Sequence, residues 1–182
     1  AVTFAARHPA RSGGLILIEP MMHAALTGKL GRVRRFTPIL RVLIGGIRLL
    51  NRLGLHRRTL GSLDLRALDE AYRARLAELG GRAALEARYA SIREDLDTMP
   101  IVAYLQDLVE TVRPVPLERV HVPALVLLSR ARTFADAERT HVELGRLRGA
   151  EIRTLEAAHW IPTEQPREMR EAIEAWLARI GL

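Results

Sequence analysis

Two short, uninterrupted apolar runs constrain the fold of this chain more than any other feature. They span Leu15–Ile18 and Ala124–Leu128, and residues that favour turns flank them. Apolar runs of this length without alternation are typical of strands buried on both faces, as parallel strands are. A third short strand is expected at 151–155, and helices are expected at 136–147 and 166–180. The alternation of strands and helices predicts an α/β fold with about three parallel strands and flanking helices.

A long helical insertion is expected between the first two strands. Its glycines and prolines, among them Gly31 and Pro38, are expected to break it into several helices, including 65–79, 82–95 and 100–112. The stretch 39–55 carries apolar residues mostly on one side and three arginines on another, which is the pattern of an amphipathic helix. The predicted division of the chain is a core segment at 1–20, a helical cap or lid at 21–116 and a C-terminal core at 117–182.

The net charge of +7 comes from one part of the chain. Between Pro20 and Leu63 there are nine basic residues and no Asp or Glu, while the other residues carry 19 basic and 21 acidic groups. A solvated surface is the simplest explanation for the basic segment, and recognition of an anionic or acyl substrate is an alternative. Contact with a membrane surface is a further, less favoured alternative. Nucleic acid is not an expected partner, since aromatic residues make up 4% of the chain and no stacking platform or DNA-binding motif is evident.

The composition also narrows the chemistry. The chain has no cysteine, which excludes disulfides, thiolate metal ligands and a cysteine nucleophile. Its six histidines show no paired ligand spacing, so we expect no metal, and nothing in the sequence implies a cofactor. The first 14 residues lack the pattern of a signal peptide, and we expect a cytoplasmic location.

His159 is the strongest candidate for a catalytic residue. It lies in the loop between the third expected strand and the last helix. The carboxyl ends of parallel strands are where the active sites of α/β proteins gather, and an imidazole can transfer protons near neutral pH. A single histidine in such a loop can equally be structural.

Both ends of the chain resemble α/β hydrolases. The closing segment consists of a strand, Ala157-Ala158-His159-Trp160, a polar-proline step and a helix that ends in Ala175-Trp176-Leu177. It resembles the C-terminus of family members with a catalytic histidine after the final strand. The opening AVTFAARHPARSGGLILIEP resembles the segment that follows the nucleophile elbow, and the family places a cap between these two segments. The resemblance implies a partial α/β-hydrolase fold, His159 as general base, and no cofactor.

The resemblance also implies an acid that orients the histidine, normally just after the second strand. The corresponding position falls near Arg132, and the nearest carboxylate is that of Asp136. We therefore expect Asp136 to be the acid, although it can equally be the N-cap of the following helix. Glu143 and Glu156 are weaker candidates.

The nucleophile is missing from the expected pattern. A Gly-x-Ser-x-Gly elbow needs glycines around the serine because the turn is strained, and none of the four serines, Ser12, Ser62, Ser91 and Ser129, has them. Residues matching Ala1–Thr3 would follow the elbow almost directly. We therefore expect the chain to begin just past the nucleophile and to be nearly inactive alone.

The substrate implied by the resemblance is a small organic molecule with an ester, thioester, epoxide or C–C bond. Met21, Met22 and Trp160 are expected to line its pocket, although methionines also fill gaps in a core. The alternative function is a degenerate hydrolase-like module that binds ligands or serves as a scaffold without catalysis. The edge of the strand at Leu15–Ile18 predicts a possible homo-oligomer.

Overall fold

The computed structural model describes residues 1–55, 60, 62, 64–80, 83, 93–131 and 135–182. The chain divides into two compact units. Unit one contains residues 1–26 and 114–182, and unit two contains residues 27–113.

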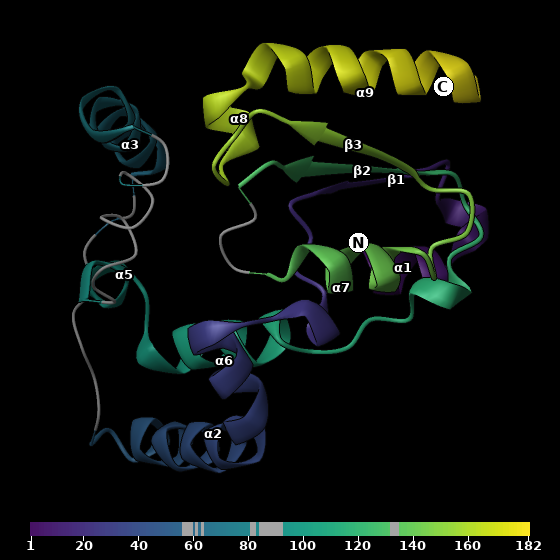
Figure 1. The fold of residues 1–182 in the computed structure, drawn as a ribbon. Coiled ribbons are helices and arrows are strands. Elements are labelled where there is room, and N and C mark those ends of the chain that lie inside the picture. The colour runs from purple at the N-terminus through teal and green to yellow at the C-terminus, as the bar shows by residue number, and fades with distance from the viewer. Residues whose placement is uncertain (56–59, 61, 63, 81–82, 84–92, 132–134) are drawn as a thin grey trace. The chain divides into compact units, whose positions relative to one another are not determined.

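A three-stranded parallel sheet forms the centre of unit one (Figure 1). Its strands are β1 (Leu15–Ile18), β2 (Ala124–Ser129) and β3 (Glu151–Leu155), in the order β1-β2-β3. Leu17 lies opposite Val126 in the register of β1 and β2. All six residues of β2 are buried, because strands flank it on both sides and helices cover both faces. The predicted α/β fold with three parallel strands is therefore confirmed.

Helices cover the two faces of the sheet (Figure 1). α1 (Val2–Arg7) and α7 (Ala137–Leu144) lie on one face, and α9 (Pro166–Ile180) lies on the other. Alternate side chains of β2 point to opposite faces: Val126 joins the core on the α1 and α7 side, and Leu125 joins the core on the α9 side. The remaining helical turns of this unit are short: η1 (Pro9–Arg11), η2 (His23–Ala25), η3 (Leu117–Arg119) and α8 (Ile161–Glu164).

A glycine allows α9 to lie close to the chain before β1. A Cβ atom on Gly14 would lie 2.7 Å from Cη2 of Trp176, a distance that real Cβ contacts do not reach. Trp176 is 3% exposed and belongs to the core between β2 and α9. The absence of a side chain at position 14 thus allows the indole to fill this part of the core.

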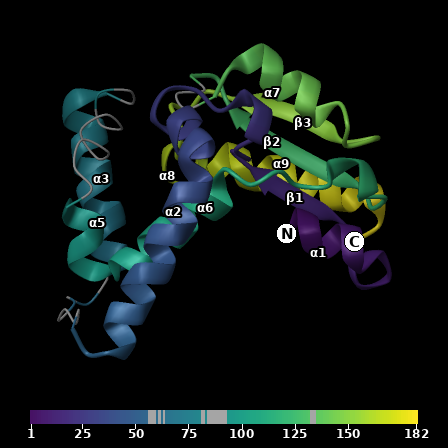
Figure 2. The same cartoon turned by 90° about the horizontal axis from the view of Figure 1, so that it is seen from below.

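Unit two is helical and contains α2 (Gly28–Arg52), α3 (Leu65–Leu79), α5 (Arg93–Thr98) and α6 (Ile101–Thr111). α2 and α6 pack against each other (Figure 2), with Ile44 and Val109 among their buried residues. Of the helix predicted at 82–95, the part before Arg93 lies almost entirely outside the described residues. None of the helices among the described residues is long and apolar enough to cross a membrane.

The sequence-based expectation of a break at Pro38 is wrong. α2 continues through Gly31 and Pro38 as one helix of 25 residues. Proline removes one backbone N–H from the helix, but one missing bond does not end a helix whose other face is packed against a neighbour. In the same turn the Thr37 hydroxyl donates to the Val33 carbonyl at 3.1 Å.

Candidate functional site

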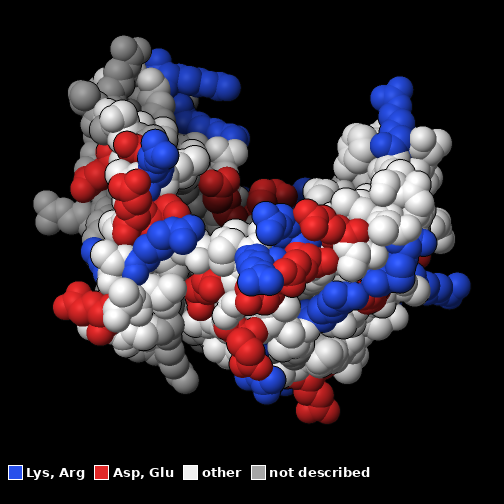
Figure 3. All heavy atoms as spheres, turned by 90° about the horizontal axis from the view of Figure 1, so that it is seen from above, with Lys and Arg blue, Asp and Glu red and all other residues white. Residues whose placement is uncertain are grey.

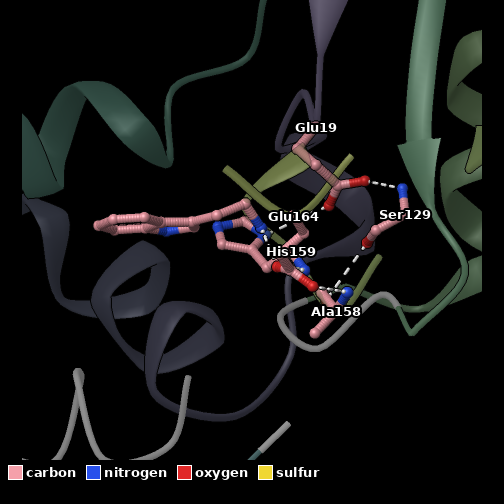
Figure 4. A network of polar contacts seen from close by, with 6 residues as sticks. Glu19, Ser129, Ala158, His159 and Glu164 are labelled. Atoms are coloured by element: carbon pink, nitrogen blue, oxygen red, sulfur yellow. Dashed lines mark hydrogen bonds and ion pairs between the residues drawn. The ribbon is translucent and has the colours of Figure 1, made fainter. Parts of the chain in front are cut away.

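His159 follows the carboxyl end of β3, in the loop that leads into α8. Its side chain is 12% exposed. The ring nitrogen Nδ1 lies 3.3 Å from Oε2 of Glu19, which follows the carboxyl end of β1 (Figure 4). The two residues are 140 positions apart in the sequence. The parallel sheet brings them together because both follow a strand at the same edge.

Glu19 is held in an unusual backbone conformation. Its φ of 48° is the one positive φ of a non-glycine residue in the described part of the chain. A side chain in this region costs about 1–2 kcal/mol, and such outliers cluster at functional sites, where the surroundings hold them. Its backbone N–H donates to the Leu127 carbonyl at 2.9 Å, which extends the β1–β2 ladder by one residue. Contacts of both its backbone and its side chain therefore hold Glu19 in place.

Ser129 contacts both Glu19 and the loop that carries His159. This last residue of β2 is fully buried, and its backbone N–H donates to Oε1 of Glu19. Its hydroxyl donates to the Ala158 carbonyl at 3.3 Å, next to the histidine (Figure 4). The middle strand thus positions the Glu19 carboxylate and supports the His159 loop.

The Glu19 contact determines how the imidazole can act. An ionised carboxylate only accepts hydrogen bonds, so this contact is a hydrogen bond in the tautomer of His159 that carries its proton on Nδ1. In the neutral ring, Nε2 is then the nitrogen that accepts a proton. This is the arrangement of a general base oriented by an acid.

A second carboxylate holds the backbone of the histidine loop. Oε2 of Glu164 accepts from the Ala158 N–H at 2.7 Å, and Oε1 accepts from the His159 N–H at 3.0 Å and the Trp160 N–H at 2.7 Å. Three successive backbone donors therefore converge on one side chain (Figure 4). This contact fixes the segment from which the imidazole projects.

The predicted acid, Asp136, has a different role in the structure. It is the N-cap of α7, where Oδ1 accepts from the Arg139 N–H at 2.8 Å, and its own N–H donates to the Ala25 carbonyl. The structure therefore gives it the alternative role that the sequence left open. Of the weaker candidates, Glu143 pairs with Arg146 and Glu156 pairs with Arg130.

Two hollows adjoin the Glu19–His159 pair. The larger is an open depression of about 450 Å³, lined by Ile18, Glu19, Met21, His159, Trp160, Pro162 and Thr163. The smaller is a niche of about 20 Å³, large enough for about one water molecule. It is lined by Glu19, Pro20, Met21, Leu128, Ala135, Thr140 and His159. Both hollows lie in unit one, so the pair can meet a ligand there.

Two of the three residues that were expected to line the substrate pocket do line a hollow, and the third does not. Met21 and Trp160 line the larger depression. Met22 does not: it is 2% exposed and belongs to the core on the α1 and α7 side. The expectation for Met22 is wrong, because the chain turns into η2 directly after it and directs its side chain inward. Among the described residues, no group of three or more metal-ligating side chains lies together.

Two residues of the site, Glu19 and Glu164, were not expected from the sequence. The acidic-proline step after the first strand marked the end of that strand, and this position is the available signal for Glu19. Glu164 lies five residues after His159, and its capping of the loop depends on the tight turn of α8. No feature of the sequence alone predicts that turn.

The fold is similar to that of solved hydrolase structures. An enol-lactonase from Burkholderia xenovorans LB400 has a TM-score of 0.55 and 16% identity, with 97% of this chain and 60% of that chain covered. A hydrolase from Pseudomonas aeruginosa PA01 has a TM-score of 0.51 and 17% identity, with 97% and 59% covered. Est816, described as an N-acyl homoserine lactone degrading enzyme, has a TM-score of 0.51 and 17% identity, with 96% and 61% covered.

These likenesses define the fold. No family model matches the sequence, and no curated protein matches it. At identities of 16–17%, the structural similarity shows the fold alone. The chain has part of the α/β-hydrolase fold and spans about 60% of the length of the structures that it matches.

Proposed function

We propose that this chain supplies the histidine and the acid of a hydrolase active site that acts on a small organic substrate. His159 is the general base, and Glu19 is the acid that orients it. The observation that carries the proposal is the contact between Glu19 Oε2 and His159 Nδ1 at the carboxyl edge of a parallel sheet. Glu19 takes the place that the sequence analysis gave to Asp136.

The roles follow from the geometry of the pair. With its Nδ1 proton held by Glu19, the imidazole takes the proton of a nucleophile on Nε2 and later returns it to the leaving group. The negative charge of Glu19 also stabilises the imidazolium formed between the two steps. Glu164 holds the loop backbone so that the ring stays in register with the acid.

The size of the depression supports a small substrate. Its volume of about 450 Å³ lies within the usual range of small-molecule sites. An ester, thioester, epoxide or C–C bond is the reacting group that we propose. Two of the similar structures are described as lactone enzymes, and lactones are cyclic esters.

The nucleophile is proposed to come from outside the 182 residues. No Gly-x-Ser-x-Gly motif occurs in them, and Ser91 lies outside the described residues. The Ser12 hydroxyl donates to the His8 carbonyl, and the buried Ser129 hydroxyl donates to the Ala158 carbonyl. Loss of the nucleophile costs about 10⁶-fold in kcat in a serine hydrolase. We therefore expect little or no turnover by these residues alone.

The test compares variants of the protein expressed from its complete gene, with aryl esters, a thioester and an epoxide as substrates. His159→Ala is expected to remove activity. Glu19→Gln is expected to lower kcat by about 10²–10⁴-fold, because the ring loses the acid that fixes its tautomer. Asp136→Asn is the matched control and is expected to change kcat less than twofold (about 0.4 kcal/mol at most). A loss of activity in Asp136→Asn equal to that in Glu19→Gln would contradict the assignment of the acid.

A binding module without catalysis is the second candidate. The absence of a Gly-x-Ser-x-Gly motif from the 182 residues favours it. In that case apolar or anionic ligands would raise the melting temperature of the protein, while none of the substrates would be hydrolysed. Such a result would replace the hydrolase proposal.

A further inference from the structure

The larger depression beside His159 has mostly apolar walls. We call four of the residues that line it the apolar wall: Ile18, Met21, Trp160 and Pro162. Ile18 is the last residue of β1 and is 38% exposed, whereas the other residues of this strand are buried or half-buried. Apolar and aromatic side chains that line a hollow are the usual contacts of the apolar part of a small ligand.

The shape of the site directs a ligand toward the apolar wall. The wall comes from the end of β1, the segment that follows it, and the loop from His159 into α8. On the side of Leu128 and Thr140 lies the smaller niche of about 20 Å³, which holds about one water molecule. A ligand that contacts the imidazole therefore has room for its bulk only in the larger depression.

The ionisable groups at the depression do not favour an anion. Among the described residues that line it, Glu19 and His159 are the ionisable ones, and none is Lys or Arg. The Glu19 carboxylate accepts from the Ser129 N–H and contacts the His159 ring, neither of which carries a permanent positive charge. A ligand carboxylate in this hollow would lose water without gaining a cation, and it would lie near a charge of its own sign.

Arginines of the neighbouring elements are paired with acids. Arg130 follows β2, and its Nε lies 2.6 Å from Oε1 of Glu156, which follows β3. On α9, Nε of Arg167 lies 2.8 Å from Oε1 of Glu171. Figure 3 shows positive and negative side chains next to one another on this face of unit one. These pairs offset the positive charge of the arginines, so they do not prepare this side of the unit for an anion.

We propose that the depression binds the apolar part of an uncharged substrate, such as an alkyl or aryl acyl group, and discriminates against anionic substrates. The inference rests on the proposed function for the reacting bond and names the class of molecule that carries it. The apolar wall supplies the contacts, and the Glu19 carboxylate disfavours a second negative charge. Of the acyl and anionic substrates that the sequence left open, the uncharged acyl type is the one that fits this hollow.

Two ligands of the same shape test the charge preference without any turnover. Phenylbutyramide is uncharged, whereas phenylbutyrate is anionic at neutral pH. Calorimetric titration of the protein expressed from its complete gene measures the Kd of each. We expect the amide to bind about tenfold more tightly than the carboxylate, because only the carboxylate is desolvated beside a like charge. Equal or tighter binding of phenylbutyrate, or no binding of phenylbutyramide, would overturn the proposal.

A pair of aromatic substitutions locates the ligand. Trp160→Ala is expected to weaken the binding of phenylbutyramide about fivefold, because the ligand loses an aromatic contact. Phe4→Ala is the control: it removes an aromatic side chain of α1 that is 52% exposed and does not line the depression, and the Kd is expected to stay within about twofold. Equal effects of the two substitutions would overturn the proposal, because the ligand would then bind elsewhere.

A cation placed in the apolar wall is expected to change the preference. Ile18→Lys is expected to shift the ratio of the two Kd values about tenfold toward phenylbutyrate, since its ammonium group can pair with the carboxylate. Ile18→Met keeps a long apolar side chain at this position and is expected to leave the ratio within about twofold. Both ligands are measured on the same variant, so a loss of stability affects them equally. An unchanged ratio in Ile18→Lys would overturn the proposal.

Turnover separates this inference from the proposed function. An aryl hexanoate and the aryl monoester of adipic acid share an acyl chain and differ by a terminal carboxylate. We expect the uncharged ester to have a kcat/KM about tenfold higher. Hydrolysis of both esters with equal kcat/KM would overturn the inference and leave the proposed function standing. Hydrolysis of neither, with phenylbutyramide still bound in preference to phenylbutyrate, would refute the proposed function and support the binding preference.

Discussion

Replacing Glu164 with alanine is expected to destabilise unit one substantially. The substitution removes the acceptor of three backbone N–H groups, at 2.7, 3.0 and 2.7 Å, in a loop where Ala158 is 8% exposed. Hydrogen bonds to charged groups contribute roughly 1.5–3 kcal/mol each. The three share two oxygens and water can partly replace them, so we expect a loss of about 3–4 kcal/mol in the free energy of unfolding.

Urea denaturation followed by tryptophan fluorescence measures this loss. Both tryptophans of the chain, Trp160 and Trp176, lie in unit one, so the signal reports on that unit. Glu164→Gln keeps one acceptor oxygen and is expected to lose about 2 kcal/mol. Glu168→Ala, an exposed glutamate in the first turn of α9, is the control and is expected to lose no more than about 1 kcal/mol.

A small effect would refute the reasoning. If Glu164→Ala changed the free energy of unfolding by less than about 1 kcal/mol, the three contacts would not hold the loop. The NMR signal of the His159 Nδ1 proton gives an independent readout. It is expected to exchange faster with water in Glu164→Ala than in the wild type, because the ring loses its register with Glu19.

Three further substitutions test other parts of unit one by urea denaturation. Asp136→Ala is expected to lower the free energy of unfolding by about 1 kcal/mol, the value of an N-cap, and an effect below about 0.3 kcal/mol would contradict that role. Gly14→Ala is expected to cost about 1–3 kcal/mol, because its Cβ would lie 2.7 Å from Trp176, and an unchanged stability would show that the indole can move aside. The hydrogen bond from Arg153 lowers the pKa of Glu151 below its usual 4.5, so this ion pair stabilises the fold above that pH and the contribution is lost as the pH falls further. Glu151→Gln should therefore reduce the free energy of unfolding by at most about 1 kcal/mol at pH 7. It should have no effect at a pH where the carboxyl is protonated in both the folded and the unfolded protein. An equal effect at the two pH values would contradict this role of the ion pair.

The sheet could be predicted because two of its three strands, β1 and β2, consist of short apolar runs. β2 is buried on both faces, so Leu125 and Val126 are both apolar although they point to opposite cores. The same uniformity hides the register, since no polar residue from Ala124 to Leu128 marks which face each side chain joins. The order of the strands likewise depends on packing that the sequence does not display.

The carboxylate that contacts His159 could not be predicted because its position depends on long-range pairing. Glu19 and His159 meet because β2 lies between the strands that precede them, and Ser129 at its end contacts both sides of the pair. Asp136 lies closer along the sequence to the position where an acid was expected, but it is the N-cap of α7. Sequence distance is thus a poor guide to which carboxylate reaches a ring at a sheet edge.

Predictions from local sequence preferences share a common limit, which two features show: the left-handed conformation of Glu19 and the continuous helix through Pro38. In both cases a local preference is overruled by contacts elsewhere: the Leu127 carbonyl and Ser129 hold the first, and packing of α2 holds the second. Local propensity therefore gives the expected conformation only where no distant contact opposes it.

The position of β1 has a consequence for how the sheet can grow. Among the strands that the structure describes, β1 pairs with β2 on one side, and its other side offers a row of backbone donors and acceptors. A further strand that adds there in parallel would lie about 4.8 Å away. Its last residue would arrive beside Glu19, at the same edge as His159. Strand addition at this margin would thus bring a new side chain next to the Glu19–His159 pair.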